Sequence, residues 1–328
     1  MDTCIKCLLN DNMPSVRINS DGLCNYCTDS IAHCTDCNSF DEEFVNLLEM
    51  YRDRRYQVIM AFSGGKDSTY TLKMIREKYN ASILAVTFNN GFLSEASLRN
   101  ISKVTDQLGV DGMILKYPAA KLIKAFRFIE DGRAFPKMAL ERASSICNLC
   151  IMLIKNMIYY EAIIRDIPII CFGWTPGQAG IAKPLLKLDY RTVTKVFENV
   201  RNAIVNELGM EYGKYFLDSG FMSSNQDRIP YLYYPFVKNH YNEAAIFDDI
   251  KKIGWESPEN TDGNSSNCLL NSYANQSHME RFGYHPYAYE ISNMVRDGYM
   301  TRAEGAEKME NIKNDNTYEI VRNMFRSI

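Results

Sequence analysis

The sequence predicts an α/β fold in which helices pack on a parallel sheet, preceded by a cysteine-rich module and followed by a helical extension. Short apolar runs alternate with segments whose apolar residues recur at helical spacing, as strands and crossover helices do. A polar turn rich in glycine directly follows the first apolar run, at residues 63–68. Pairs of cysteines near the N-terminus predict a small module held by metal rather than by a core of its own.

The composition is that of an ordinary soluble globular protein. The chain has 328 residues, of which 46% are hydrophobic and 23% charged. No apolar run comes near the ~20 residues that span a bilayer, and the N-terminus has no basic or apolar leader, so we expect a cytoplasmic protein. A formal net charge of −3 gives no basic excess, which counts against a nucleic-acid substrate without excluding a local basic patch.

The turn at residues 63–68 is the centre of the predicted nucleotide site. An apolar run at 58–62 precedes it as a buried strand, and residues 69–79 follow it with helical spacing. A strand, a turn and a helix start present free backbone N–H groups and the positive end of a helix dipole, which suit a phosphate. The residues that we expect to bind the nucleotide here are Ser63, Gly64, Gly65, Lys66, Asp67, Ser68 and Thr69.

Each residue type in this turn has a role in binding a nucleotide. The glycines let the backbone approach an anion, the hydroxyls supply hydrogen bonds, and Lys66 supplies positive charge. Asp67 would repel a phosphate unless a divalent cation lay between them, so the motif predicts Mg²⁺ together with ATP. Lys66 and Asp67 are therefore the candidate catalytic residues. The alternative is an ordinary glycine turn between a strand and a helix.

The motif resembles the S-G-G-x-D-S signature of PP-loop ATP pyrophosphatases, and the spacing of a Walker loop is missing. The resemblance implies a Rossmann-like PP-loop domain, similar to the adenine nucleotide alpha hydrolases. Such enzymes cleave ATP between the α and β phosphates and adenylate a carbonyl oxygen. The resemblance also implies that the loop after the second strand holds adenine. Phe88 is a candidate to flank the base there, and plain packing of Phe88 is the alternative.

The segments that follow complete the predicted sheet. Further strands are expected at residues 81–88, 111–116 and 167–172, and helices at residues 94–108 and 151–164. Parallel strands bind ligands beyond their carboxyl ends. The turns that should therefore face one crevice are 63–68, 88–92 and 173–180, the last of which begins with Gly173. Beyond them, residues 183–210 have a helical pattern and residues 218–227 are typical of a surface loop.

The predicted organisation has four parts. They are a zinc-binding cysteine module at residues 1–40, a linker helix at 41–56, a PP-loop ATP-binding domain at 57–215 and a helical substrate-binding region at 216–328.

Two C-x-x-C pairs in the N-terminal module have the spacing of a zinc ribbon. The pairs are Cys4 with Cys7 and Cys24 with Cys27. Each pair makes a tight turn whose sulfurs face the same way, and two such turns complete a tetrahedron around Zn²⁺. A third pair, Cys34 with Cys37, either replaces one of the first two or stays as free thiols, and the sequence leaves this open.

Three further cysteines form a second set. Cys147 and Cys150 make another C-x-x-C, and Cys268 stands alone much later. The set resembles that of iron–sulfur PP-loop tRNA thiolases, in which three thiolates hold a [4Fe–4S] cluster and leave one iron open. The alternatives are a second zinc site, or cysteines that pack as small apolar side chains.

Taken end to end, the chain resembles the N-acetyl sugar amidotransferases of surface-polysaccharide and lipopolysaccharide biosynthesis. The shared motifs include residues 21–27, the PP-loop, residues 173–177 and residues 298–305. The resemblance implies a nucleotide-sugar substrate whose acetamido group becomes an acetamidino group, with ammonia from a partner glutaminase. The alternative is a sulfurtransferase, which the second cysteine set favours and which would thiolate a tRNA base or a small molecule.

Overall fold

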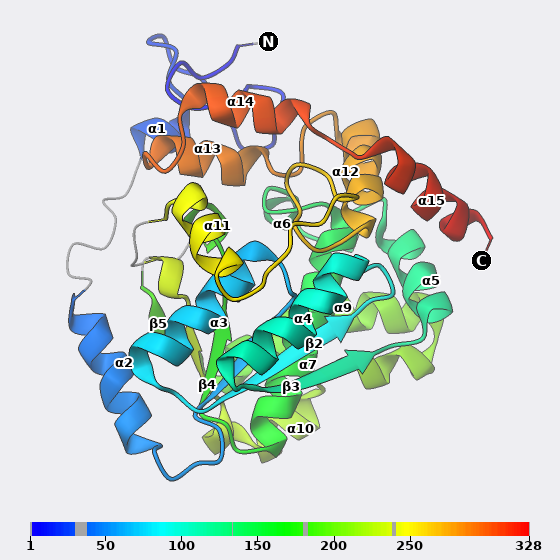
Figure 1. Ribbon diagram of the computed structural model, residues 1–328. Coiled ribbons are helices and arrows are strands. Elements are labelled where there is room, and N and C mark those ends of the chain that lie inside the picture. The colour runs from blue at the N-terminus through cyan, green and yellow to red at the C-terminus, as the bar shows by residue number, and fades with distance from the viewer. Residues whose placement is uncertain (1, 30–37, 133, 180–182, 238–240, 328) are drawn as a thin grey trace.

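The computed structural model describes residues 2–29, 38–132, 134–179, 183–237 and 241–327. A six-stranded sheet lies at the centre of the described chain, in the order β3-β2-β1-β4-β6-β5 (Figure 1). The strands are β1 (Val58–Ala61), β2 (Ile83–Asn89), β3 (Asp111–Lys116), β4 (Ile169–Phe172), β5 (Leu185–Lys187) and β6 (Tyr231–Tyr233). All neighbouring strands pair in parallel except β5, which pairs antiparallel with β6 at one edge. The predicted α/β fold is confirmed.

Alternate residues of the central strands enter two separate cores, one on each face of the sheet. On β1, Ile59 belongs to one core, and Val58 and Met60 belong to the other. Side chains alternate across a strand, so a sheet covered on both faces needs apolar residues at every position. This explains why the strands appear in the sequence as continuous apolar runs.

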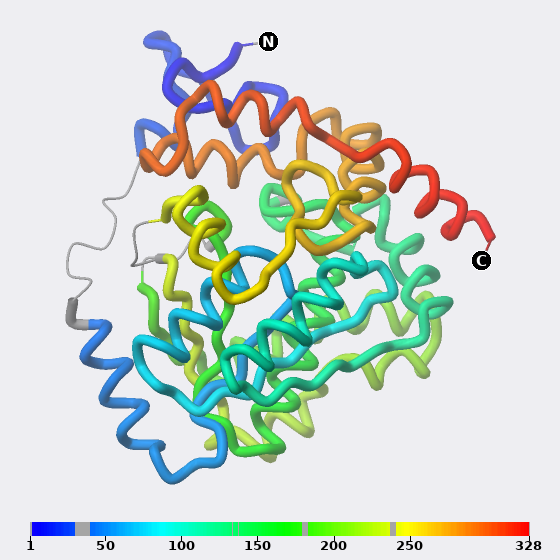
Figure 2. Tube along the Cα trace, viewed as in Figure 1, coloured from blue at the N-terminus to red at the C-terminus, as the bar shows by residue number. Residues whose placement is uncertain are grey.

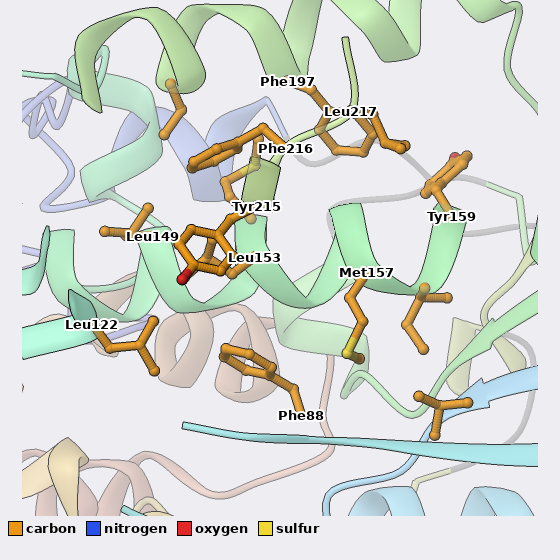
Figure 3. Close-up of a cluster of buried hydrophobic side chains, with 14 of the residues drawn as sticks. Phe88, Leu122, Leu149, Leu153, Met157, Tyr159, Phe197, Tyr215, Phe216 and Leu217 are labelled. Atoms are coloured by element: carbon orange, nitrogen blue, oxygen red, sulfur yellow. The ribbon is translucent and has the colours of Figure 1, made fainter. Parts of the chain in front are cut away.

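The first core lies between the sheet and three helices, α5 (Ala119–Ile129), α7 (Ser145–Ile164) and α9 (Tyr190–Leu208). Figure 3 shows side chains from several elements around α7, among them Phe88 of β2 and Phe197 of α9. Helix α7 contacts β1, β2 and β4, so it crosses the middle of the sheet. Its first turns therefore lie near the carboxyl ends of those strands, where a ligand of a parallel sheet binds.

Four helices cover the second core. They are α2 (Asn38–Met50), α3 (Lys66–Tyr79), α4 (Glu95–Leu108) and α11 (Glu243–Lys251). Helix α2 is the predicted linker helix. Ser94 caps α4, and its side chain accepts a hydrogen bond from the Ser97 amide.

The C-terminal helices lie beyond the carboxyl ends of the strands (Figure 1). They are α12 (Leu270–Phe282), α13 (Ala288–Arg296), α14 (Arg302–Glu310) and α15 (Asp315–Arg326). Helices α12 and α15 also contribute side chains to the first core. Figure 1 shows the N-terminal module, blue, against α13 and α14, orange. The remaining short elements are α1 (Asn25–Thr28), α6 (Lys137–Leu140), α8 (Pro176–Ala179), η1 (Met210–Tyr215), α10 (Ser219–Ser224), η2 (Gln226–Arg228) and η3 (Pro235–Val237).

Several predicted elements differ from the structure. The predicted helix at 183–210 is the edge strand β5 followed by α9, and the predicted surface loop at 218–227 contains α10. Strand β6 was not predicted, and it enters the sheet from beyond residue 215, where we ended the ATP-binding domain. Three residues are too few to show a period, so the sequence pattern could not reveal β5 or β6.

One described helix combines membrane-spanning length with an apolar composition. Helix α7 has 20 residues and is apolar enough to cross a membrane by length and composition. However, 61% of its most apolar window is buried inside the fold, where it packs against the sheet, α5 and α9. A core helix of this kind meets the same criteria of length and composition as a membrane span.

Helix α2 packs on the sheet through Phe44, together with Leu47 and Leu48. Phe44 is fully buried, and its ring stacks on Tyr233 of β6 with centroids 3.9 Å apart. We expect Phe44→Ala to lower the free energy of unfolding by about 3–5 kcal/mol. The neighbouring Val45, which is 48% exposed, provides the control. Val45→Ala should change stability by less than about 0.5 kcal/mol in the same urea titration. Equal effects of the two substitutions would contradict this packing.

Candidate active site and metal centres

The PP-loop lies between β1 and α3 and is braced by residues far away in the sequence. Gly64 has a φ of +72°, and its carbonyl accepts hydrogen bonds from Trp255 Nε1 at 2.9 Å and Asn100 Nδ2 at 3.2 Å. A Cβ at this position would lie 2.5 Å from the Ser97 carbonyl oxygen. Two features therefore require glycine at position 64: the positive φ of its backbone and its close approach to α4.

The polar groups of the loop are hydrogen-bonded to hydroxyls in the structure. The Ser63 amide donates to Ser68 Oγ at 3.3 Å, and the Lys66 amide donates to Ser266 Oγ at 3.0 Å. Asn267 lies against Gly65, where an added Cβ would be 3.3 Å away from its Cβ. These hydroxyls occupy the kind of position at a helix start that suits a phosphate oxygen.

Ser266 and Asn267 were missed by the sequence analysis. They lie about 200 residues after the motif that they contact, and no periodicity or motif marks them. Figure 2 shows that the segment between α11 and α12, drawn in gold, passes back over α3, α4 and the sheet. The only signal was the polar cluster that directly precedes Cys268.

The predicted catalytic pair, Lys66 and Asp67, forms an ion pair. Lys66 Nζ lies 2.8 Å from Asp67 Oδ2, 2.7 Å from the Tyr241 hydroxyl and 3.2 Å from Glu243 Oε1. Burial opposes the charge, but Asp67, Tyr241 and Glu243 hold the pKa of Lys66 well above its usual value. The ammonium group lines a polar cavity of about 560 Å³ that also includes Lys308.

A second cavity, of about 290 Å³, lies on the other side of the loop. Asp67 lines both cavities, and so do the residues around Ser266, which form the partition between them. The second cavity, called here the inner cavity, is formed by the PP-loop, the carboxyl ends of β1, β2 and β4, the first half of α7 and residues 264–271. The three turns after β1, β2 and β4, which were predicted to face one crevice, therefore all contribute to the inner cavity.

Two of the predicted nucleotide-binding residues lie at strand ends of the inner cavity. Phe88 lines the cavity but is only 6% exposed and packs edge-on against Tyr117. Gly173 follows β4, and a Cβ there would lie 2.9 Å from Ser68 Cα. Glycine at this position lets the end of β4 approach the start of α3, which narrows the site beside the PP-loop.

Cys147, Cys150 and Cys268 all open onto the inner cavity. Helix α7 begins at Ser145 rather than near 151, so the first two cysteines lie in its first turns, capped by Ser144, whose Oγ accepts from the Cys147 amide. Asn90 Nδ2 donates to Cys150 Sγ at 3.5 Å and to Cys268 Sγ at 3.6 Å. The three thiols therefore converge beside the nucleotide loop.

Backbone hydrogen bonds fix Cys268 in this position. The Leu269 amide donates to the Phe92 carbonyl at 2.8 Å, and the Ser94 amide donates to the Asn267 carbonyl at 2.9 Å. The turn before Cys268 is closed by Asp262, whose Oδ1 accepts from the Asn264 amide. The remote cysteine is thus joined to the loop after β2, and Asn90 in that loop is a site residue that the sequence analysis did not name.

The second set brings three thiols and one shared amide donor to the same cavity. Burial raises the pKa of Cys147 to about 12 and also raises the pKa values of Cys150 and Cys268. Thiols in this environment stay protonated unless a metal ion or cluster replaces the proton. An amide donor shared by two sulfurs also suits thiolate ligands, because it compensates negative charge on both.

The first four cysteines form a compact tetrahedral group in the N-terminal module. The sulfurs of Cys4, Cys7, Cys24 and Cys27 all lie within 4.8 Å of one another. The Cys4–Cys27 and Cys7–Cys24 sulfur distances are 3.7 Å and 3.6 Å. Zinc–sulfur bonds of about 2.3 Å in a tetrahedron require sulfurs about 3.8 Å apart, so the four residues fit Zn²⁺. Cys34 and Cys37 lie outside the described residues.

The zinc group contacts the C-terminal layer through two arginines. Arg296 of α13 points its Nε at Cys27 Sγ, 3.4 Å away, and Arg302 of α14 donates to the Cys7 carbonyl at 3.2 Å. Four thiolates around one Zn²⁺ leave a net negative charge, which a guanidinium group neutralises. The module therefore docks on α13 and α14 partly by charge.

The zinc assignment predicts the outcome of metal analysis on single cysteine variants. The full chain should hold about one Zn²⁺ in this module, and Cys7→Ser should lose it and lower the melting temperature. Cys171→Ala is the matched control, because Cys171 is fully buried in β4 away from the module. Retention of this zinc in Cys7→Ser would contradict the assignment.

The close approach at Gly64 predicts a loss of nucleotide binding in Gly64→Ala. Gly283, which caps α12, has a similar φ of +77°, and an added Cβ there would have no atom within 4 Å. Gly283→Ala therefore measures the cost of a positive φ alone, about 1–2 kcal/mol. Both variants should lose that stability. Only Gly64→Ala should also weaken ATP binding, by about tenfold or more, when calorimetry is used to measure affinity. Equal ATP affinities would contradict the role of the loop.

Comparison with known proteins finds a family match within the part of the chain that contains the PP-loop. Residues 57–161 match the profile of the family described as Queuosine biosynthesis protein QueC. An uncharacterized protein of Methanocaldococcus jannaschii is 22% identical over 259 residues, which is 79% of this chain and 74% of that protein.

Solved structures of low identity also resemble the chain. The U34-tRNA thiolase NcsA from Methanococcus maripaludis, solved with its [4Fe–4S] cluster, is 16% identical with a TM-score of 0.36, covering 91% of this chain and 86% of that one. NMN synthetase from Francisella tularensis is 11% identical with a TM-score of 0.33, covering 84% of this chain and 92% of that one. NH₃-dependent NAD synthetase from Campylobacter jejuni is 11% identical with a TM-score of 0.32, covering 59% of this chain and 95% of that one.

Proposed function

We propose that this chain, whose central unit is of the PP-loop ATP pyrophosphatase type, adenylates a carbonyl oxygen with ATP and then replaces that oxygen by sulfur. The observation that carries the proposal is that Cys147, Cys150 and Cys268 open onto the same cavity as the PP-loop. An activated carbon formed beside the loop would lie next to the three cysteines. Carbonyl activation and delivery of a nucleophile then take place in one enclosed space.

The first step uses the loop. The acceptor's carbonyl oxygen attacks the α-phosphorus of ATP, the bond between the α and β phosphates breaks, and pyrophosphate leaves. The amides at the start of α3, freed from Ser266 and Ser63, would bind phosphate oxygens and stabilise the charge that develops. Asp67 would hold Mg²⁺, and Lys66 would neutralise pyrophosphate once ATP separates it from the Asp67 carboxylate.

The second step takes place at Cys147, Cys150 and Cys268. Sulfur at the oxidation level of sulfide attacks the activated carbon, and AMP leaves with the original carbonyl oxygen. The acceptor exchanges C=O for C=S, and no atom is oxidised or reduced. A [4Fe–4S] cluster held by the three cysteines would supply an iron that is open to exogenous sulfur. Inorganic sulfide is the co-reactant that this proposal requires.

Transfer of nitrogen to an N-acetyl sugar is the second candidate. It shares the adenylated intermediate and differs only in the nucleophile, ammonia from a partner glutaminase. The motif at residues 298–305, on which that resemblance partly rests, has a structural use here, because Gly305 packs α14 closely against Leu8 and Val295. The metal content of the second cysteine set decides between the two candidates.

The proposed sulfur transfer predicts the metal content of protein purified without oxygen. We expect about four iron and four sulfide ions per chain besides zinc, with visible charge-transfer absorption. Cys147→Ala, Cys150→Ala and Cys268→Ala should each lose the iron and keep the zinc. Cys171→Ala should keep both, since Cys171 lies in β4 outside the cavity lining.

Zinc without iron in the wild-type protein would contradict sulfur transfer by this set. The amidotransferase reaction would then be the better proposal. The acceptor would be sought by incubating the protein with ATP and ammonia rather than with ATP and sulfide.

A further inference from the structure

One wall of the inner cavity carries two cations around a single aromatic ring. The guanidinium carbon of Arg142 lies 3.9 Å from the centroid of the Trp174 ring, and Lys155 Nζ lies 4.8 Å from the same ring. Arg142 and Trp174 line the cavity. Lys155 is not itself a lining residue, but it follows Ile151 and Ile154 of α7, which line the cavity, and its Nζ contacts the ring of Trp174.

Neither cation forms an ion pair with a carboxylate in the described part of the chain. Burial, together with the nearby Arg142, lowers the pKa of Lys155 to about 7, and burial also lowers the pKa of Arg142. Tyr234 and, more weakly, Glu290 favour the charged form of Arg142, and Glu290 lies beyond ion-pair distance, where it accepts a hydrogen bond from Thr175 Oγ1 at 2.8 Å. Two neighbouring cations in a partly dry wall repel one another, and a bound anion would remove that cost.

The place of this cation pair in the sheet separates it from the expected position of the adenine. Phe88 lies near the end of β2 and Asn90 directly follows it, on one side of β1, whereas Trp174 follows β4, on the other side. The PP-loop follows β1 and lies between them. A nucleotide whose base lies at β2 and whose phosphates lie at the loop leaves the β4 side of the cavity for the acceptor.

We propose that Arg142 and Lys155 bind a phosphate or diphosphate group of a small acceptor molecule, with Trp174 holding the two cations in place. A guanidinium fork and an ammonium together match a phosphate, which carries more charge and more acceptor oxygens than a carboxylate. This proposal rests on the proposed function, because it places the acceptor beside the nucleotide. It makes the acceptor a phosphorylated metabolite rather than an uncharged one.

The test is a binding experiment on the full chain with the PP-loop already filled. The protein is saturated with Mg²⁺ and α,β-methylene-ATP, which cannot be cleaved between its α and β phosphates. UDP-N-acetylglucosamine, which carries a diphosphate, is then titrated by calorimetry, and uncharged N-acetylglucosamine is titrated in parallel. We expect the diphosphate to bind and the uncharged sugar to bind at least about tenfold more weakly.

The variants assign that binding to the two cations. Arg142→Gln and Lys155→Gln should each weaken the diphosphate by about tenfold or more, and Lys155→Arg should retain most of the affinity. Lys121→Gln is the matched control, because Lys121 lies over Tyr212, 5.3 Å from the ring centroid, and outside the inner cavity. Affinity for α,β-methylene-ATP should stay within about twofold in every variant, which also shows that each variant folds.

Three results would overturn the inference. The filled wild-type protein binds no diphosphate, or the glutamine variants bind it normally, or those variants lose the ATP analogue instead, which would assign the cations to ATP. Displacement of the diphosphate by tRNA, with loss of tRNA binding in the same variants, would replace the small acceptor with RNA. Failure of the wild-type protein to bind the ATP analogue would count against the proposed function, and the two failures are therefore distinguishable.

Discussion

The contact between the PP-loop and residues 264–268 determines the architecture of the whole site. One hydrogen bond, from the Lys66 amide to Ser266 Oγ at 3.0 Å, joins parts of the chain 200 residues apart. The same segment presses on Gly65, separates the two cavities and carries Cys268 to Asn90. Together with the hydrogen bonds of Leu269 to Phe92 and of Ser94 to Asn267, this contact holds Cys268 beside the PP-loop.

A second constraint acts from the opposite side of the molecule. The first four cysteines and their loop contact α13 and α14 through Arg296 and Arg302, and α13 carries Glu290, whose carboxylate accepts a hydrogen bond from Thr175 after β4. The N-terminal module therefore packs against α13, which lines the polar cavity with Glu290. Charge supports this arrangement, since the thiolates need a cation and α13 provides one. This accounts for a metal module far from the PP-loop in the sequence and in the fold.

Much of the fold could be predicted from local sequence patterns. Strands β1, β2 and β4 are nearly continuous apolar runs and were expected as strands, whereas the edge strand β3 is mostly exposed. The PP-loop and the N-terminal cysteines were recognisable because their chemistry needs fixed spacings. Residues 58–79 formed the predicted strand, turn and helix almost to the residue.

The rest of the site depends on contacts that no local pattern encodes. Asn90, Ser266 and Trp255 reach the loop or the cysteines only after the chain folds back on itself. Lys66 was expected beside a phosphate, but with Asp67, Tyr241 and Glu243 nearby it pairs with its own neighbour. Arg142 and Lys155 are ordinary charged residues in the sequence, and only their shared contact with Trp174 makes them notable.

The most direct test of the central claim is a crystal structure, determined without oxygen, of the full chain with Mg²⁺ and α,β-methylene-ATP. The claim is that carbonyl activation and sulfur delivery share the inner cavity. We predict the triphosphate on the amides of residues 64–66, and an iron–sulfur cluster on Cys147, Cys150 and Cys268 that opens toward the α-phosphate. A single zinc ion on these cysteines, closed by Asp262 as a fourth ligand, or a nucleotide bound outside this cavity, would contradict the account.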